Sequence, residues 1–444
     1  MQTLRATDQD FEARFHRLCA RGSEEDEAGV AEAARAIVAD VRARGDEALL
    51  GYTRRFDGWN PARASDLVAG PRELAVAWKA LPAAGRRALR TAADRIRDFH
   101  RRETDAVVPS YRDRLGARLG QVSRPLSRVG LYVPGGTARY PSSVLMTAIP
   151  AQVAGVGEIV AVSPADRATG DVDAWTLAAC HVSGVSRLFR VGGAQAVAAL
   201  AHGTATVPAV DKICGPGNAY VAAAKRLVFG TVDIDMIAGP SEVLVLADAK
   251  ASAAEAAADL LAQAEHDVRA VSVLVTPSER VATAVRAEVD RQLAGLPREE
   301  IARRSIVERG AIVIARSLAH AVELADRFAP EHLVLLVEGA ARLVPRLSRA
   351  GAVFVGRRTP EAVGDYVAGP SHVLPTAATA RFASPLSVAT FRRRMSVVEM
   401  TDRSLAALAP VVEALAAAEG LEAHARAVRV RLPPTQARPR ARRK

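Results

Sequence analysis

RVGLYVPGG, residues 128–136, joins an apolar run to a Gly/Pro turn, and the fold can be worked out from this stretch. The apolar run is typical of a strand, and the turn ends it. The next stretch, SSVLMTAIPAQVAG, is typical of a helix with Ser142 or Ser143 as its N-cap. Strand, turn and helix in this order predict the first part of a parallel α/β sheet.

The same alternation continues along most of the chain. Further apolar runs, most of them followed by a helical stretch, occur at EIVAVSP, RLFRVGG, VDKICGPG, EVLVLAD, SVLVTP, AIVIA, HLVLLVEG and AVFVG. Continuous apolar runs predict strands that are buried on both faces, as in doubly wound folds. We therefore expect an α/β fold of two doubly wound Rossmann-like domains, one of them discontinuous, with small helical segments at the N- and C-termini.

Composition is that of a globular protein, with 49% hydrophobic and 25% charged residues. No apolar run approaches the ~18 residues that span a bilayer, and the polar N-terminus MQTLRATDQDFEARF lacks the apolar core of a secretory signal. The three cysteines, Cys19, Cys180 and Cys214, are odd in number and far apart. These features predict a cytoplasmic protein without a disulfide framework or a membrane partner.

Of the net charge of +11, five charges come from basic residues within the last seven positions, which leaves +6 over the rest of the chain. The tail PPTQARPRARRK is Pro-rich and basic, which is typical of disorder. Aromatic residues make up 4% of the chain, too few for a base-stacking surface. We expect no nucleic-acid partner, although a basic α/β protein that binds RNA stays open as a non-catalytic alternative.

Glycine-rich turns follow three of the predicted strands, at Gly135-Gly136, Gly192-Gly193 and Gly215-Pro216-Gly217-Asn218. Ligands of α/β sheets collect at the carboxyl ends of the strands, where such turns let backbone N–H groups approach a phosphate. None of the turns matches G-x-G-x-x-G, because Tyr220 stands at the third glycine position after Gly215 and Gly217. Taken singly, each turn can also be explained as a tight turn between a strand and a helix that binds no ligand.

FAPEHLVLL, residues 328–336, places a carboxylate and an imidazole side by side at the beginning of a predicted strand. Pro330 breaks any helix, so Glu331 and His332 lie on a turn from which both can face one pocket. Such a pair is suited to acid and base catalysis near neutral pH. The other interpretation is a histidine that only stabilises the turn beside a solvated glutamate.

Metal donors are sparse, and no H-E-x-x-H or C-x-x-C motif occurs. The donors that deserve testing are Gln263, His266, Asp365 and His424. On a helix, Gln263 and His266 share a face and Glu265 points elsewhere. Together with a carboxylate and a distant imidazole they would form a zinc site, while a solvated polar helix end is the alternative.

Nine motifs occur in one order along residues 25–430: VGLYVPGG, YPSSVLM, GGAQAVAALAHGT, VDKICGPGN, IDMIAGPSEVLVLAD, DLLAQAEH, APEHLVLL, GDYVAGPSHVLPT and EGLEAHA. In this combination the chain resembles the histidinol dehydrogenase family. The resemblance implies a homodimeric enzyme that oxidises L-histidinol through L-histidinaldehyde to L-histidine, the last two steps of histidine biosynthesis. It implies two NAD+ consumed per turnover and one Zn²⁺ per subunit.

The resemblance also assigns residues, motif by motif. The NAD+ contacts it implies are Tyr132, Gln195 and Asn218, and the proton-transfer pair is Glu331 and His332. The zinc ligands it implies are Gln263, His266, Asp365 and His424. The substrate contacts it implies are Ser241, Gln263, His266, His332, Asp365, His372, Glu419 and His424. In this family the region of Glu419 and His424 crosses to the partner subunit, which implies an active site shared between subunits.

The chain departs from the family pattern at Ser371, where Asn is often found, and this puts the hydrogen bonds of that loop in doubt. Cys214, in a candidate site turn, keeps open a rival mechanism in which a thiol attacks the aldehyde.

The expected segments are an N-terminal helical segment (1–23), a discontinuous α/β domain with the zinc and catalytic residues (24–130 with 240–380), a Rossmann-like NAD-binding domain (131–239), a C-terminal helical dimerisation segment (381–432) and a disordered basic tail (433–444).

Overall fold

The computed structural model describes residues 1–21, 27–104, 106–135 and 140–433 of the chain. Gly136 and nearly all of the predicted basic tail lie outside these residues. The chain divides into two compact units. The first contains residues 1–103 and 125–391, and the second contains residues 104–124 and 392–444.

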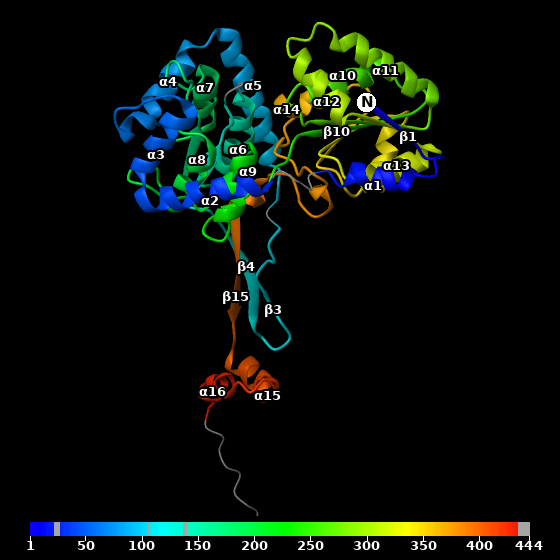
Figure 1. Ribbon diagram of the computed structural model, residues 1–444. Helices are drawn as coiled ribbons and strands as arrows, with labels where there is room; N and C mark the ends of the chain where they lie inside the picture. The colour runs from blue at the N-terminus through cyan, green and yellow to red at the C-terminus, as the bar shows by residue number, and fades with distance from the viewer. Residues whose placement is uncertain (22–26, 105, 136–139, 434–444) are drawn as a thin grey trace, which may run out of the picture. The chain divides into compact units, whose positions relative to one another are not determined.

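Within the first unit, one six-stranded sheet has the order β2-β7-β6-β5-β8-β9. All neighbouring strands are parallel except β2 and β7, which are antiparallel. We call this sheet and its helices α2–α9 the first lobe (Figure 1). Its strands are β2 (Val68–Ala69), β5 (Arg128–Tyr132), β6 (Glu158–Ser163), β7 (Arg187–Arg190), β8 (Lys212–Cys214) and β9 (Asp233–Ile234). Its helices are α2 (Glu27–Arg44), α3 (Asp46–Tyr52), α4 (Pro71–Ala80), α5 (Ala83–His100), α6 (Pro141–Ala154), α7 (Ala174–Ser183), α8 (Gly193–His202) and α9 (Ala219–Val228).

The other six-stranded sheet of the first unit has the order β1-β12-β11-β10-β13-β14, with every neighbouring pair parallel. We call this sheet and its helices the second lobe. Its strands are β1 (Gln2–Arg5), β10 (Glu242–Ala247), β11 (Val271–Thr276), β12 (Ala311–Ile314), β13 (His332–Leu336) and β14 (Ala352–Val355). Its helices are α1 (Phe11–Cys19), α10 (Ala253–Ala264), α11 (Glu279–Leu293), α12 (Glu299–Arg309), α13 (Leu318–Phe328) and α14 (Glu361–Tyr366). The predicted α/β class with two Rossmann-like sheets is confirmed.

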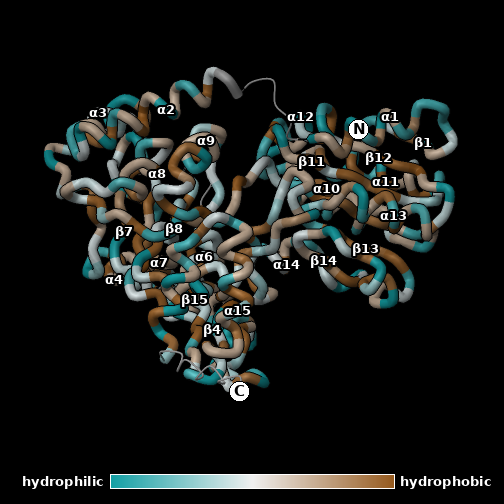
Figure 2. The backbone as a smooth tube through the Cα atoms, turned by 90° about the horizontal axis from the view of Figure 1, so that it is seen from below, coloured by the Kyte–Doolittle hydropathy of each residue, from teal (hydrophilic) through white to brown (hydrophobic). Residues whose placement is uncertain are grey.

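Both sheets are buried on both faces, as the continuous apolar runs predict. Along β10, Val243 and Val245 belong to one hydrophobic cluster, whereas Leu244 and Leu246 belong to another on the opposite face. Figure 2 shows hydrophobic residues gathered along the strands of each lobe. Among the described residues, no helix has the length and apolar character that crossing a bilayer requires.

The arrangement of the N-terminal third differs from the expected domain boundaries. Residues 1–23 were expected to be a helical segment, but β1 adds a parallel strand to the edge of the second lobe beside β12. Residues 24–130 were expected in the same domain as 240–380, yet α2 packs on α8 and α9, and α4 packs on α7. The pattern of an amphipathic helix predicts that one face covers a sheet, but it does not indicate which sheet.

The second unit contains a three-stranded sheet and two helices. The sheet has the order β15-β4-β3, built from β3 (Tyr111–Arg112), β4 (Arg118–Pro125) and β15 (Arg392–Glu399). The helices are α15 (Asp402–Ala418) and α16 (Glu422–Arg429). The C-terminal segment is therefore not wholly helical, because β15 pairs with a strand almost three hundred positions earlier in the chain.

Candidate active site

The carboxyl ends of β5, β7 and β8 carry the glycine turns. Gly215 has a φ of 111°, and a Cβ on it would lie against the carbonyl oxygen of Tyr132. Gly135 and Gly192 both lie against Pro164, which follows β6. The turns therefore meet at one edge of the sheet, next to the crevice between β5 and β8 where the strand order reverses.

The three predicted cofactor residues lie at this edge of the first lobe. Tyr132 is buried at the end of β5, and its hydroxyl accepts a hydrogen bond from the Gly193 N–H at 3.0 Å. Gln195, in the first turn of α8, is 1% exposed, and neither of its amide atoms has a hydrogen-bond partner among the described residues. Asn218 caps α9, because its Oδ1 accepts from the Val221 N–H at 3.1 Å.

A cleft of about 2120 Å³ is lined by both lobes of the first unit. Pro216, Gly217 and Asn218 line it from the first lobe. Among the residues that line it from the second-lobe sequence are the predicted site residues Ser241, Gln263, His266, Glu331, His332, Asp365 and His372. With Asn218, the structure thus brings together eight of the predicted site residues, which lie far apart in the chain.

In the second lobe, the site lies at the amino ends of the strands. His332 is the first residue of β13 and Glu242 is the first residue of the adjacent β10. The His332 Nδ1–H donates to the Glu242 carbonyl oxygen at 2.9 Å, and the Glu242 N–H donates to Glu331 Oε2 at 2.7 Å. The predicted position of Glu331 and His332, at the beginning of a strand, thus differs from the carboxyl ends where ligands of α/β sheets usually collect.

The hydrogen bond to Glu242 assigns the tautomer of His332 and leaves Nε2 as the free nitrogen. His332 Nε2 is buried, has no hydrogen-bond partner among the described residues, and lies 3.8 Å from Asp365 Oδ1. Burial lowers the pKa of His332, so the ring stays neutral and can accept a proton. Burial, together with the Glu242 carboxylate, raises the pKa of Glu331 well above its usual range.

Asp365, on α14, lies among three imidazoles. Besides His332, its carboxylate lies 3.9 Å from His266 Nε2 and 3.9 Å from His372 Nδ1. The ring of His372 is held in place, because its Nδ1–H donates to the Asp365 backbone oxygen at 2.9 Å. The adjacent Ser371 keeps the loop bonded despite the departure from the family pattern: its hydroxyl donates to the Met146 oxygen at 3.0 Å and accepts from the Val373 N–H at 3.2 Å.

Gln263 and His266 both line the cleft, but not as two residues of one helix face. α10 ends at Ala264, and His266 stays close because its N–H donates to the Gln263 oxygen at 3.2 Å. Glu265 also lines the cleft, contrary to the expectation that it points elsewhere. With its amide nitrogen turned toward acceptors, Gln263 donates to Glu361 Oε1 at 2.7 Å.

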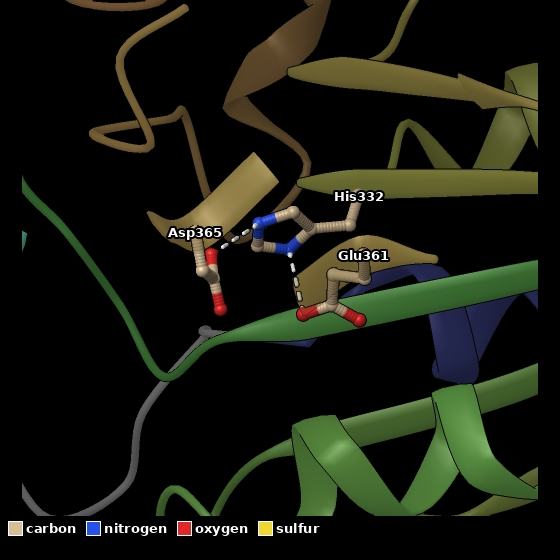
Figure 3. Close-up of side chains that lie close together, drawn as sticks. All are labelled: His332, Glu361 and Asp365. Carbon is tan, nitrogen blue, oxygen red and sulfur yellow. Dashed lines mark ion pairs between the residues drawn. The ribbon is translucent and has the colours of Figure 1, made fainter. Parts of the chain in front are cut away.

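A second combination of residues could also hold a metal. His332, Glu361 and Asp365 offer ligand atoms that lie within 4.8 Å of one another, with the His332 ring between the two carboxylates (Figure 3). Glu361 is 1% exposed, and burial raises its pKa well above the usual range. Asp365 belongs both to this group and to the predicted zinc ligands. The described residues therefore provide nitrogen and oxygen donors of the kind that zinc binds.

Sequence reasoning missed Arg21, Glu242 and Glu361. Arg21 binds the Glu242 carboxylate through two hydrogen bonds of 2.8 and 2.7 Å, and its guanidinium lies 3.4 Å over the ring of Phe328. Glu242 Oε1 also accepts from the Ala377 N–H at 2.7 Å. A charged residue at the beginning of a buried strand was a signal for Glu242. Nothing near Arg21 points to a partner 221 positions away.

Three further candidates lie on other elements. Glu419 is the C-cap of α15 and His424 is an exposed residue of α16, both in the second unit. Cys214 is the last residue of β8 and is fully buried, and burial raises the pKa of its thiol. A buried thiol of raised pKa is poorly suited to nucleophilic attack.

Comparisons with known proteins agree with one another. A family model described as histidinol dehydrogenase matches residues 20–432. The chain is 50% identical over 432 residues to histidinol dehydrogenase of Geobacter sulfurreducens, covering 97% of this chain and 100% of that one. It is 49% identical over 431 residues to the enzyme of Acinetobacter baylyi, covering 97% and 99%. The crystal structure of histidinol dehydrogenase from Elizabethkingia anophelis superposes with a TM-score of 0.90 at 33% identity, covering 97% of each chain.

Proposed function

This chain belongs to the histidinol dehydrogenase family, and from that premise we propose that it oxidises L-histidinol to L-histidine. The reaction passes through L-histidinaldehyde and completes the biosynthesis of histidine. The observation that carries the proposal is the free, buried Nε2 of His332 beside Glu331 in a cleft that both lobes line. The roles of individual residues below are parts of this proposal.

The dinucleotide is proposed to bind at the carboxyl edge of the first lobe. NAD+, when bound, accepts a hydride in each of the two oxidations. The unpartnered amide of Gln195 and the backbone N–H groups of the glycine turns support binding there, since an anionic ligand needs such donors. Tyr132 and Asn218 complete the proposed contacts, and Asn218 also faces the cleft.

In the first oxidation, His332 is the proposed base. The alcohol must lose its O–H proton as the hydride leaves, and the free Nε2 of His332 can accept that proton. The Glu242 carbonyl keeps the ring in the required tautomer, since it holds Nδ1–H at 2.9 Å. Arg21 fixes Glu242 in turn, so the base is anchored through a buried ion pair.

The second oxidation requires water, because only the hydrated aldehyde carries a hydride to transfer. Glu331 is the proposed residue that activates this water. Its raised pKa suits proton uptake near neutral pH. Once the proton from the first step has left to solvent, His332 can accept the proton of the hydrate.

Zinc is proposed to be held by Gln263, His266, Asp365 and His424, with one ion per subunit. Bound zinc would orient the imidazole and amine of the substrate. We favour this combination over His332, Glu361 and Asp365, because it leaves His332 Nε2 free to accept protons. Ser241, His372 and Glu419 are the remaining proposed substrate contacts.

A homodimer is proposed, with Glu419 and His424 supplied by the partner subunit. Both residues lie in the second unit, where α15 exposes Val411 and Leu415, and Leu421, between α15 and α16, is also exposed. Exposed apolar side chains of this kind are typical of a subunit interface.

We propose a cytoplasmic location and no nucleic-acid or membrane partner. Salt-dependent RNA binding by a chain without the basic tail would contradict this proposal.

The function is tested by supplying the purified protein with L-histidinol and NAD+ and counting NADH formed per L-histidine. Two NADH per histidine are expected. A count of one, with the aldehyde as product, would contradict the second oxidation.

Inactive Glu331 and His424 variants mixed into verified heterodimers should regain activity if the active site is shared. No recovery would contradict the proposed crossing of subunits.

A further inference from the structure

Asp57 is a half-buried carboxylate of the first lobe that the proposed chemistry does not use. It is the last residue of the short π-helix η1 (Thr53–Asp57), and Gly58 turns the chain with a φ of 70°. The Asp57 carboxylate accepts a hydrogen bond from the Gly192 N–H, in the glycine turn after β7. Its other oxygen, Oδ2, is buried and finds no hydrogen-bond partner in the described part of the chain.

Asp57 lies beside the residues proposed to bind the dinucleotide. Gly192 precedes Gly193, whose N–H holds the Tyr132 hydroxyl. Burial raises the pKa of Tyr132 to about 12, and the nearby Asp57 charge contributes to that shift. Gln195, with both amide atoms unpartnered, lies in the same turn of chain. Unsatisfied buried polar atoms from two segments thus meet at one edge of the sheet, which indicates a polar ligand there.

Rossmann-like sites commonly place an acidic residue near the end of the second strand, where it binds a ribose hydroxyl. In the first lobe this strand is β6, which ends at Ser163, and the carboxylate that follows it, Asp166, is exposed and accepts hydrogen bonds from the Ala168 and Thr169 N–H groups of its own loop. Pro164 packs against Gly135 and Gly192. Asp166 is therefore engaged within its own loop, whereas η1 supplies Asp57, whose carboxylate contacts the glycine turn at Gly192.

Arg167 lies next to Asp57, since its side chain covers Gly58 and its charge acts on the Asp57 carboxylate. An arginine in this position is the type of residue that accommodates the 2′-phosphate of NADP+. The carboxylate opposes that effect, because it repels a phosphate and attracts hydroxyl groups. Burial raises the pKa of Asp57 to about 6, so the carboxylate stays mostly charged at pH 8.

We propose that Asp57 accepts hydrogen bonds from the ribose hydroxyls of NAD+ and excludes the 2′-phosphate of NADP+, which makes it a specificity-determining residue for the cofactor. This inference rests on the proposed NAD+ dependence. It goes beyond it by naming the group that selects the dinucleotide. The unpartnered Oδ2 is the atom that a ribose hydroxyl would satisfy.

The test compares the wild-type protein with Asp57→Asn and Asp57→Ser in L-histidinol oxidation with NAD+ and with NADP+. Losing a hydrogen bond to a charged group should raise the KM for NAD+ about tenfold or more. The ratio of kcat/KM for NAD+ to that for NADP+ should fall by about a hundredfold, since repulsion of the 2′-phosphate is lost as well. The kcat at saturating NAD+ should change little, because Asp57 does not touch the reacting atoms.

A matched control is Asp171→Asn, which neutralises an exposed carboxylate of the same lobe and should leave the ratio unchanged. A structural role for Asp57 predicts a different pattern: activity with both dinucleotides would fall in parallel, and the melting temperature would drop. On our proposal, Asp57→Asn melts at or above the wild-type temperature at pH 8, because a half-buried charge is removed and the acceptor for Gly192 remains.

An unchanged NAD+ to NADP+ ratio in folded Asp57→Asn overturns the inference while wild-type activity with NAD+ stands. A wild-type protein that forms no NADH from L-histidinol overturns the proposed function itself. The two failures are therefore distinguishable in one set of assays.

Discussion

The two lobes of the first unit share a strand order but use opposite ends of their strands. Apart from the edge strands β2 and β1, β7-β6-β5-β8-β9 and β12-β11-β10-β13-β14 follow the same order, and the earliest of the five strands in the chain is central in each. The first lobe presents carboxyl ends with glycine turns, whereas the second presents amino ends with Glu242 and His332. One topology thus serves two kinds of site.

Helix dipoles give a physical reason for this difference. At the carboxyl ends of parallel strands, helix N-termini such as that of α9 face the site and favour anions. At the amino ends, helix C-termini face the site, and α10 ends at Ala264 beside Gln263 and His266. The partial negative charge there favours cations. A dinucleotide phosphate therefore suits the first lobe, and zinc or a substrate amine suits the second.

The largest expected effect is on the second lobe. His332→Ala should lower kcat for both oxidations by about 10²–10⁴-fold, because the proposed base is removed. The KM for NAD+ should stay within a factor of about two if the first lobe binds the dinucleotide independently. Stopped-flow measurement of NADH formation from histidinol and from histidinaldehyde checks both steps. A large rise in the KM for NAD+ would contradict the proposal that the first lobe binds the dinucleotide independently of the second.

His266→Asn should lose zinc and most of the activity, by about 10–100-fold or more, since one proposed ligand is removed. Metal content measured by plasma emission after dialysis is the direct readout. Full zinc content in the variant would remove His266 from the ligand set and favour the alternative combination that includes Glu361. His320→Asn, which alters a histidine of α13 outside the cleft, is a suitable control.

Glu331→Gln separates the two chemical steps within the second lobe. Oxidation of histidinaldehyde should slow by about tenfold more than oxidation of histidinol, because only the aldehyde needs an activated water. Rates measured with each substrate at saturating NAD+ give the comparison. Equal losses in the two reactions would argue against a role for Glu331 in water activation.

Gly215→Ala tests the backbone of the first lobe. The φ of 111° and the contact with the Tyr132 carbonyl strain any Cβ there, at a cost of about 1–3 kcal/mol in stability. The KM for NAD+ should rise while zinc content stays at the wild-type level. Urea denaturation and NAD+ titration are the measurements, with Gly230→Ala, whose φ of 100° brings strain but no contact, as the control. Loss of zinc would show that the lobes are more strongly coupled than we expect.

Cys214→Ser should have the smallest effect. The thiol is buried at the end of β8 and its pKa is raised, so it takes no part in the proposed chemistry. Both oxidations should keep activity within about twofold, with a stability loss of about 1 kcal/mol from burying a hydroxyl. Selective loss of aldehyde oxidation would revive the thiol mechanism and assign chemistry to the first lobe.

Sequence patterns were sufficient for the fold class and for most of the site. The alternation of apolar runs and helical stretches indicates the secondary structure and burial of each segment by itself. Two parallel sheets could therefore be predicted without knowing which strands are neighbours. The family motifs pointed to residues such as Gln263, Asp365 and His332, and the structure gathers these three around one cleft. Their chemical roles stay predictions.

Tertiary structure alone decided which strand ends carry chemistry and which segments complete each lobe. The ion pair of Arg21 with Glu242 joins residues 221 positions apart, and the Glu242 carbonyl that orients His332 has no sequence signal at all. The pattern of helices α2–α5 does not indicate which sheet they cover, and residues 1–23, expected to be a helical segment, supply the edge strand β1. Periodicity encodes how a segment is buried, whereas its partners depend on how distant parts of the chain meet in space.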